Sequence, residues 1–238
     1  MVYLSKPCAF VNQSLFDHSK GSYAVLSKFL NDAYYAVISR RLKSVGIQLK
    51  PEEVKKLIEI SVKLHDIGKA AEYYQNQFDE NCLSNKKEPS FIFHEIGSSL
   101  FFYHSNYTDD KRVKRLLALA ALNHLNAIRG LVDFKPNQLP KGAKEEMLKI
   151  EKYGKVLLSK LGFNFEVRDY TINDYIEMMS DFINPPKDED LKLYKLHNLF
   201  LAPIIIGDNL DSHYARSISE RRRFIKLLEV ELDEDPII

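Results

Sequence analysis

The sequence predicts an all-α fold in which the whole chain, residues 1–238, forms one helical bundle. Glycine and proline are scarce, with nine of each in 238 residues. A barrel or sandwich built on many tight turns would need more glycine. Apolar residues make up 45% and charged residues 28%, which is typical of a globular protein with a sizeable core. Because no segment resembles an interdomain linker, we expect a single domain that ends in an acidic tail at about residues 229–238.

Helical periodicity and capping residues divide the chain into long helices. Pro51 suits the first turn of the clearest one, in which an apolar stripe repeats every 3.6 residues as far as His65. Ser14 is one candidate N-cap, either Asp109 or Asp110 is another, and Pro203 is expected to kink or restart its helix. The predicted helices cover residues 13–42, 51–65, 90–104, 111–126, 143–161, 173–183, 191–213 and 217–232. A short strand is predicted at 163–169, and loops at 79–89, 133–142 and 184–190.

Composition also excludes several classes of protein. The 34 basic and 33 acidic residues leave a net charge of +1, which argues against attachment to nucleic acid or membrane by bulk charge. The longest apolar runs, 116–122 and 199–206, are too short to span a bilayer, so no membrane association is expected. Cys8 and Cys82 are not expected to form a disulfide framework, and they lack the spacing of metal ligands. We therefore expect a reducing, cytoplasmic location.

Several histidines and aspartates fall on the apolar faces of the predicted helices. His65 continues the stripe of its helix and is followed by Asp66, while His124 and Asp208 continue the stripes of two later helices. His18 and His94 share faces with apolar residues in the same way. An isolated inward histidine is more often a core residue bonded to a neighbour. Several unpaired buried groups are costly, however, and a shared metal ion would satisfy them together.

A family resemblance rests on the string His65-Asp66-Ile67-Gly68-Lys69. It looks like the signature of the HD superfamily of metal-dependent phosphohydrolases. The order of a histidine, the His-Asp pair, two more histidines and a late aspartate resembles the di-metal members. Among these, the chain is most similar to the HD nuclease of type I CRISPR systems that is separate from its helicase. That similarity also rests on His18-Ser19, His94-Glu95 and Gly207-Asp208.

The resemblance implies two divalent ions, Mg²⁺ or Mn²⁺, with other transition metals possible. His18, His65, Asp66 and Asp208 would hold the first. Asp66, His94 and His124 would hold the second, so that Asp66 is a bridging, catalytic residue. Lys69 would contact the phosphate or support a ligand. Asp211, three residues after Asp208, is expected to be solvated or a helix cap.

One departure from the family pattern concerns the residue before His124. The family commonly has two adjacent histidines followed by glycine, whereas this chain has Asn123-His124-Leu125. If Asn123 is a ligand, its carbonyl oxygen suits Mg²⁺ or Mn²⁺ better than softer metals. Which family histidine His124 represents stays open.

The function that the resemblance implies is hydrolysis of phosphodiester bonds in single-stranded DNA, or RNA, by a metal-activated water during CRISPR antiviral defence. The chain has no Gly-x-x-x-x-Gly-Lys-Ser/Thr motif, so an ATP-driven motor must be separate. The implied partners are an ATP-dependent helicase subunit and a guide-RNA surveillance complex. Basic clusters provide candidate DNA contacts; the residues chosen are Arg112, Lys114, Arg115, Arg221 and Arg222.

Two alternatives remain open. An HD-type nucleotide phosphohydrolase, such as a dNTPase or a nucleotidase, would share His65, Asp66 and Asp208. A non-enzymatic sensor or docking module with a vestigial site is favoured only by Asn123.

Overall fold

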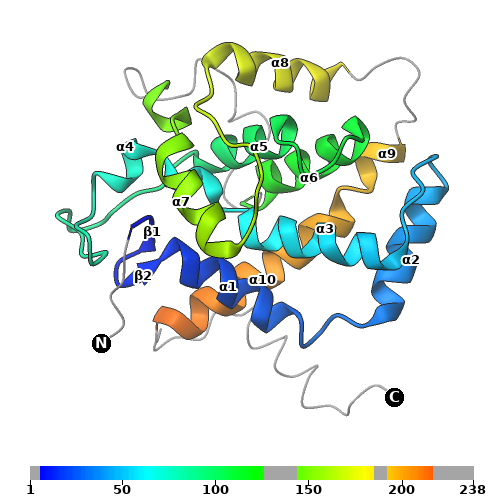
Figure 1. Cartoon of the computed structure of the whole chain (residues 1–238), viewed down its shortest axis with the longest axis horizontal. Helices are drawn as coiled ribbons and strands as arrows, with labels where there is room; N and C mark the ends of the chain where they lie inside the picture. The colour runs from blue at the N-terminus through cyan, green and yellow to red at the C-terminus, as the bar shows by residue number, and fades with distance from the viewer. Residues whose placement is uncertain (1–5, 126–143, 185–191, 217–238) are drawn as a thin grey trace.

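Helices form most of the computed structural model, which describes residues 6–125, 144–184 and 192–216 (Figure 1). This confirms the predicted all-α fold class. The α-helices are α1 (Leu15–Leu26), α2 (Asp32–Lys43), α3 (Pro51–Leu64), α4 (Glu72–Gln75), α5 (His94–His104), α6 (Lys111–Asn123), α7 (Glu151–Leu161), α8 (Ile172–Ile183), α9 (Lys192–Lys195) and α10 (Asn198–Arg216). Two 3-10 helices, η1 (Ile67–Ala70) and η3 (Glu146–Leu148), lie between them.

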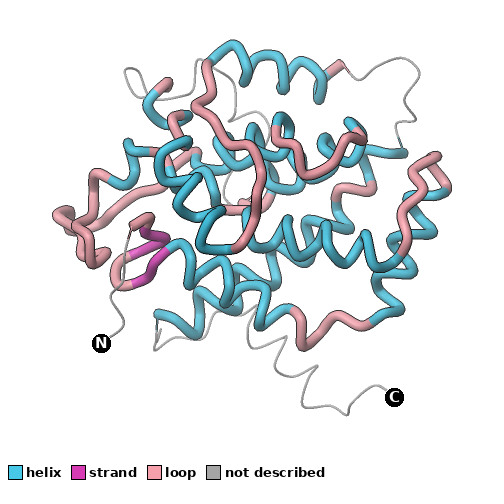
Figure 2. The backbone as a smooth tube through the Cα atoms, viewed as in Figure 1, coloured by secondary structure: helices cyan, strands magenta, loops and turns pink. Residues whose placement is uncertain are grey.

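The described β-structure is a two-stranded sheet that the sequence analysis missed. Strands β1 (Cys8–Phe10) and β2 (Gln13–Ser14) pair antiparallel just before α1, and Figure 2 shows them as the short magenta segments. The strand predicted at 163–169 is wrong: this segment is irregular in the structure. Its alternation of residue types has no neighbouring strand edge to pair with among the described residues.

The predicted helix over residues 13–42 is in fact two helices. Ser14 caps α1, as predicted, because its side chain accepts a hydrogen bond from the backbone N–H of Asp17. The chain then leaves the helix after Leu26 and restarts at Asp32, where the side chain of Asn31 accepts from the N–H of Tyr34. A second N-cap signal inside an apolar pattern therefore marked a helix start that periodicity alone did not reveal.

Other helix boundaries also moved. Helix α5 starts at His94 rather than at residue 90, because Phe93 has a left-handed backbone conformation with φ 68°. Helix α7 starts at Glu151, after η3, and Pro203 lies inside α10 without restarting it. Pro51 and Asp110 begin α3 and α6 as predicted. The predicted helix at 217–232, the acidic tail and the loop at 133–142 fall outside the described residues.

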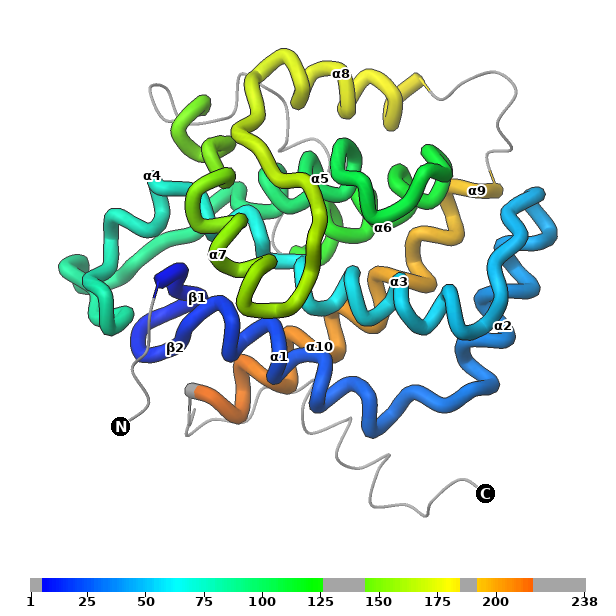
Figure 3. The backbone as a smooth tube through the Cα atoms, viewed as in Figure 1, coloured from blue at the N-terminus to red at the C-terminus, as the bar shows by residue number. Residues whose placement is uncertain are grey.

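Helices that are distant in sequence pack around one core. Helices α5 and α6 form an antiparallel hairpin, and α8 covers α5 at the top of Figure 1. Helix α1 lies along α10, so that the blue and orange ends of the described chain run side by side in Figure 3. Helix α3 contacts both α1 and α10. This arrangement brings the C-terminal end of α3 to the centre, where α1, α5, α6 and α10 meet.

The cysteine expectation is wrong, because Cys8 and Cys82 form a disulfide. Both residues are fully buried, and their Cα atoms are 5.5 Å apart. Cys8 is held by a hydrogen bond from its backbone N–H to Gln75 Oε1, and the carbonyl of Cys82 accepts from the N–H of Asn12. The two cysteines are 74 residues apart in sequence, so the sequence does not indicate that they lie close together. Their contact depends on how the β1–β2 hairpin packs against the loop after α4.

None of the helices in the described ranges combines the length and the apolar character needed to cross a bilayer.

Replacing Cys8 and Cys82 together by serine is expected to lower the free energy of unfolding by roughly 2–4 kcal/mol, because the cross-link restricts the unfolded chain. Denaturant unfolding of the wild type and the variant measures the difference. Reductant in the denaturant should destabilise only the wild type. Equal stability of the two proteins under oxidising conditions would contradict the expectation.

Candidate metal centre

The candidate site is organised around Asp66, which lies where α3 gives way to η1. Helix α3 ends at Leu64, His65 is its C-cap, and Asp66 precedes η1. Both side chains are buried, with 0% and 1% of the residue exposed. The apolar stripe of α3 carries His65 into the core, and the tighter turn of η1 then turns Asp66 toward α5 and α6.

Gly68 permits the close approach of η1 to α5. A Cβ atom at this position would lie 1.9 Å from the carbonyl oxygen of His94, so any other residue would push the two elements apart. The N–H of Gly68 donates to Ser98 Oγ at 2.9 Å. As a result, His94 Nε2 lies 2.7 Å from Asp66 Oδ1.

The two carboxylate oxygens of Asp66 face different groups of ligand atoms. Oδ2 lies 3.2 Å from His18 Nε2 and 3.6 Å from His65 Nε2. Oδ1 lies 2.7 Å from His94 Nε2 and 3.4 Å from His124 Nε2. Asp208 Oδ1 completes the first group, at 3.3 Å from His18 Nε2. Ligand atoms of His18, His65, Asp66 and Asp208 all lie within 4.8 Å of one another, as do those of Asp66, His94 and His124.

These are the two ligand sets that the family resemblance implied. The structure therefore brings together all six residues predicted from the sequence, although they come from α1, the α3–η1 junction, α5, the end of α6 and α10. That these six residues bind metal ions is a proposal.

The hydrogen bonds of the four imidazoles show that the cluster suits a cation. Nδ1 of His65, His94 and His124 each donates to a backbone carbonyl, at 2.8, 2.6 and 2.6 Å respectively. His18 Nδ1 donates to Asp211 Oδ2 at 2.7 Å. In the neutral tautomer that these bonds select, all four Nε2 lone pairs point at carboxylate oxygens. Lone pairs that face one another need a cation or a proton between them.

Buried atoms without hydrogen-bond partners support the same conclusion. His18 Nε2 and His65 Nε2 are buried and have no hydrogen bond, and both lie within 3.6 Å of Asp66 Oδ2, which is paired with Lys69. Unsatisfied buried polar atoms are rare in native proteins, and here two imidazole nitrogens converge on one carboxylate. Imidazole nitrogen and carboxylate oxygen together suit Mn²⁺, other transition metals and, through the carboxylates, Mg²⁺. The residues present therefore fit divalent ions.

The pKa shifts reflect the same crowding of charge. Burial would raise the pKa of Asp66, but Lys69, His65 and His94 outweigh it and hold that pKa well below its usual range. Burial would lower the pKa of His18 and His124, but the surrounding carboxylates raise both. Burial does prevail at His94, whose pKa is lowered. Without a metal ion, the carboxylates therefore favour a proton on His18 and on His124.

Lys69 lies beside the cluster with its side chain largely buried. Its ammonium is 2.5 Å from Asp66 Oδ2 and 5.2 Å from the centre of the Phe91 ring. Its carbonyl accepts a hydrogen bond from Gln75 Nε2 at 2.6 Å, and this bond fixes the turn. The ion pair with Asp66 places Lys69 where it could support the predicted bridging ligand, and that role stays a prediction.

Asp211 belongs to the hydrogen-bond network of the candidate site, which the sequence analysis missed. It was expected to be solvated or a cap, but it is buried at 9% exposure and bonds both His18 Nδ1 and Gln13 Nε2. Gly21 makes room for it, since a Cβ there would meet Asp211 Oδ1 at 1.8 Å. Such carboxylate–histidine pairs orient metal ligands. A signal was available: Asp211 lies one helical turn after Asp208, on nearly the same face.

Asn123 is buried beside His124, with 4% of the residue exposed. The hydrogen bond that the structure shows for its side chain joins Nδ2 to His197 Nε2 at 3.4 Å. Its Oδ1 is buried without a hydrogen bond. A role for this oxygen as a metal ligand remains a prediction.

A cavity of about 340 Å³ opens from the cluster to the surface. Asp66, Lys69, His94, His124 and Asp208 line its floor and sides. Around them lie Phe10 from β1 and a loop segment that runs from Pro89 to Ile92. The disulfide ties together the two segments that carry these walls, since Cys8 is on β1 and Cys82 is in the same loop.

Three of the five predicted DNA-contact residues lie in the part of the chain that the structure describes. Arg112 pairs with Asp110 at 2.8 Å, and Arg115 pairs with Asp181 at 3.0 Å. Lys114 lies on the same helix, α6, at the end distant from His124. Arg221 and Arg222 fall outside the described residues.

The helical fold and the buried His-Asp pair, flanked by further histidines, define an HD domain of the metal-dependent hydrolase class. A family model described as "Cas3, HD domain" matches residues 9–133, which include every predicted ligand except Asp208. The chain belongs to this Cas3 HD domain family.

Similar proteins carry names of the same family. The chain is 48% identical over 236 residues to a CRISPR-associated endonuclease Cas3-HD of Saccharolobus solfataricus, covering 96% of this chain and 97% of the relative. It is 28% identical to the protein of the same name from Methanocaldococcus jannaschii, over 94% of each chain. Among solved structures, the CRISPR-associated Cas3 HD domain protein of M. jannaschii matches with a TM-score of 0.57 and 26% identity, covering 82% of this chain and 97% of that one.

Asp211→Ala is expected to weaken Mn²⁺ binding by about 10- to 100-fold, because His18 would lose the group that orients it. Isothermal titration calorimetry measures this without relying on activity. Asp211→Asn should recover part of the affinity, since its carbonyl oxygen can still accept from His18 Nδ1. Wild-type affinity in the alanine variant would show that Asp211 plays no part in the site.

Metal binding is expected to release protons and to strengthen as the pH rises. The raised pKa values of His18 and His124 mean that the metal-free protein keeps protons on both imidazoles to a higher pH than an ordinary histidine does, and each displaced proton changes the affinity about tenfold per pH unit below that pKa. Calorimetry in buffers of different ionisation enthalpy counts the protons released. An affinity that stays flat or falls between about pH 6 and about pH 8 would be inconsistent with these shifts.

Proposed function

We propose that this chain is the metal-dependent nuclease of a CRISPR defence system and that it hydrolyses phosphodiester bonds of single-stranded DNA, with RNA as a possible further substrate. The observation that carries the proposal is the position of Asp66, whose two oxygens each face a separate group of ligand atoms and which itself lines a solvent-open cavity. Membership of the Cas3 HD family supports the enzyme class.

The residues of the site would have different roles in this hydrolysis. His18, His65, Asp66 and Asp208 would hold one divalent ion, and Asp66, His94 and His124 a second. Bound metal ions supply an activated water near neutral pH and neutralise the charge that develops on the phosphoryl oxygens. Asp66 would contribute one ligand oxygen to each group. Its lowered pKa leaves its carboxylate ionised at neutral pH. Lys69 stabilises that carboxylate and adds a positive charge to the wall that a phosphate would approach.

The size and the lining of the cavity favour a single-stranded substrate over a base-paired one. Its volume of about 340 Å³ lies near the lower end for ligand pockets and suits one nucleotide better than a base pair. Phe10 and Phe91 line it, and aromatic side chains provide surfaces for bases of single strands.

Partners follow from the family rather than from the described residues. The related proteins are named as CRISPR-associated endonucleases. We propose that a separate ATP-dependent helicase and a guide-RNA surveillance complex deliver the displaced strand in the cytoplasm. We also propose that residues 1–238 act as one domain. A disulfide whose sulfurs are fully buried is shielded from soluble thiols, so it can persist in such a compartment.

A second candidate is hydrolysis of mononucleotides, which the size of the cavity also favours. A vestigial docking module is less consistent with the structure, because His and Asp donors are brought together in both ligand sets.

Purified protein with Mn²⁺ is expected to degrade labelled single-stranded DNA and to leave dNTPs and cyclic nucleotides intact. Product analysis on denaturing gels and by chromatography, across a panel of divalent metals, measures both activities in parallel. Turnover of dNTPs without strand cleavage would favour the second candidate. No turnover with any metal would refute both.

The matched variants are His65→Ala and Asp66→Asn, with Asp32→Asn on the exposed start of α2 as a control for charge. The two site variants should fall to the activity of the metal-free protein and keep their helical circular dichroism. The control should retain wild-type activity. Undiminished hydrolysis by either site variant would overturn the mechanism.

A further inference from the structure

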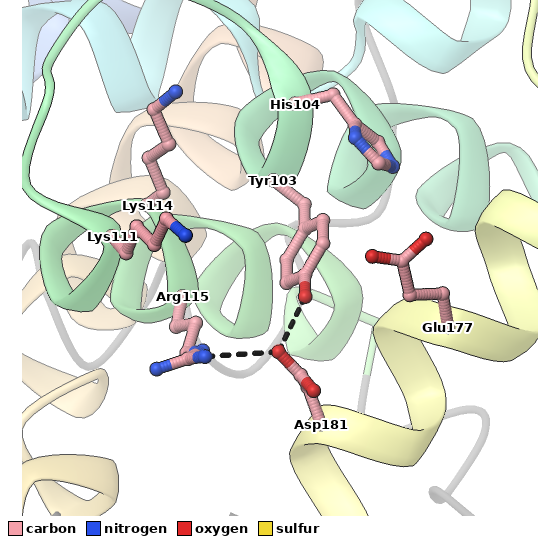
Figure 4. A pocket seen from close by; sticks show the side chains of 7 residues that line it. All are labelled: Tyr103, His104, Lys111, Lys114, Arg115, Glu177 and Asp181. Atoms are coloured by element: carbon pink, nitrogen blue, oxygen red, sulfur yellow. Dashed lines mark hydrogen bonds and ion pairs between the residues drawn. The ribbon is translucent and has the colours of Figure 1, made fainter. Parts of the chain in front are cut away.

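A second hollow lies at the other end of the α5–α6 hairpin, away from the metal centre (Figure 4). Its volume is about 330 Å³. Helix α6 contributes three basic side chains, α8 contributes two carboxylates, and the end of α5 contributes two rings. The lining residues are Tyr103, His104, Lys111, Lys114, Arg115, Glu177 and Asp181.

The lengths of α5 and α6 give the distance between the two cavities. Helix α5 starts at His94 in the metal centre and ends at His104 in the hollow, whereas α6 starts at Lys111 and is capped by His124. At a rise of 1.5 Å per residue, the two sites are about 15–20 Å apart. The hollow is therefore distinct from the candidate metal centre.

The basic side chains of the hollow are placed at an electrostatic disadvantage. Lys111, Lys114 and Arg115 are spaced i, i+3 and i+4, so they share a face in the first turns of α6, where the carboxylate of the N-cap, Asp110, is engaged by the N–H and the guanidinium of Arg112. Cations are unfavourable at the positive end of a helix, and like charges at this spacing repel. An anion bound in the hollow would relieve both effects.

Only part of this charge is compensated within the protein. Asp181 accepts a hydrogen bond from Tyr103 and pairs with Arg115 at 3.0 Å, as the dashed lines in Figure 4 show. Asp181 and Arg115 thereby hold each other in place. Lys111 and Lys114 form no ion pair with any residue that the structure describes, and Lys111 is exposed. Two ammonium groups are thus available to a ligand.

We propose that this hollow binds one nucleotide through its phosphate group. Lys111 and Lys114 face the phosphate from α6. Glu177 stands on the opposite side in Figure 4, where its carboxylate can accept hydrogen bonds from an amino group of a base. Tyr103 and His104 supply ring surfaces beside it. The nucleotide comes either free from solution or as part of a nucleic-acid strand, and the phosphate chemistry is common to both sources.

Binding is measured in EDTA, so the result does not depend on metal loading or on nuclease activity. The probes are inorganic phosphate, AMP and a short single-stranded DNA oligonucleotide, and affinities come from calorimetry or fluorescence anisotropy. The test variant is Lys111→Glu with Lys114→Glu. Lys55→Glu with Lys56→Glu, two exposed lysines of α3, changes the net charge equally and is the matched control.

The test variant should weaken binding by at least about tenfold, and the control should change it by less than about twofold at the same ionic strength. Loss of AMP binding identifies a free nucleotide as the source. Loss of oligonucleotide binding, with no AMP binding by the wild type, identifies a strand. Wild-type affinity of the test variant for every probe overturns the proposal, as does an equal loss in the control.

Thermal stability separates a binding role from a structural one. For this measurement the variant is Lys111→Gln with Lys114→Gln, because glutamate would face Glu177 and Asp181 across the hollow. Removing the repulsion between the lysines at the helix N-terminus should leave the melting temperature unchanged or raise it. A variant that loses binding together with a fall in melting temperature would mean that the lysines are structural, which counts against the proposal.

Discussion

The structure depends on one constraint: four imidazoles and two aspartates share a buried volume in which their lone pairs face one another. Each imidazole donates its Nδ1 proton elsewhere, so its Nε2 points inward at Asp66 or Asp208. A core arranged in this way is stable only with protons or metal ions at its centre. The surrounding packing maintains this arrangement, through Gly68 against α5 and Gly21 against Asp211.

The second property of the site is that its ligands come from segments far apart in the chain. His18 and Asp208 are on α1 and α10, which pack side by side, while His94 and His124 are at the open ends of α5 and α6, opposite the loop that connects these two helices. The long helices therefore act as rigid supports. The mouth of the cavity is different, because its walls are a short hairpin and a loop, and the disulfide between Cys8 and Cys82 connects them.

Sequence reasoning succeeded where a local pattern carried the information. Inward-facing polar residues on apolar stripes, such as His65 and His124, could be recognised from helical spacing. Ser14, Pro51 and Asp110 marked helix starts correctly because capping is a local interaction. It failed where the decisive contact was distant in sequence. The burial of Asp211 depends on α1, and the pairing of Cys8 with Cys82 depends on a loop 74 residues away.

The amino-acid sequence by itself determined the helical class, the family and the identity of six candidate ligands, because these depend on composition, periodicity and a short motif. Only the tertiary structure decided that Asp66 faces both ligand groups, that Asp211 orients His18 and that the two cysteines are joined. It also decided which basic residues are available, since Arg112 and Arg115 pair with Asp110 and Asp181 while Lys111 and Lys114 do not. Such outcomes depend on which side chains meet across helices, and no local spacing encodes that.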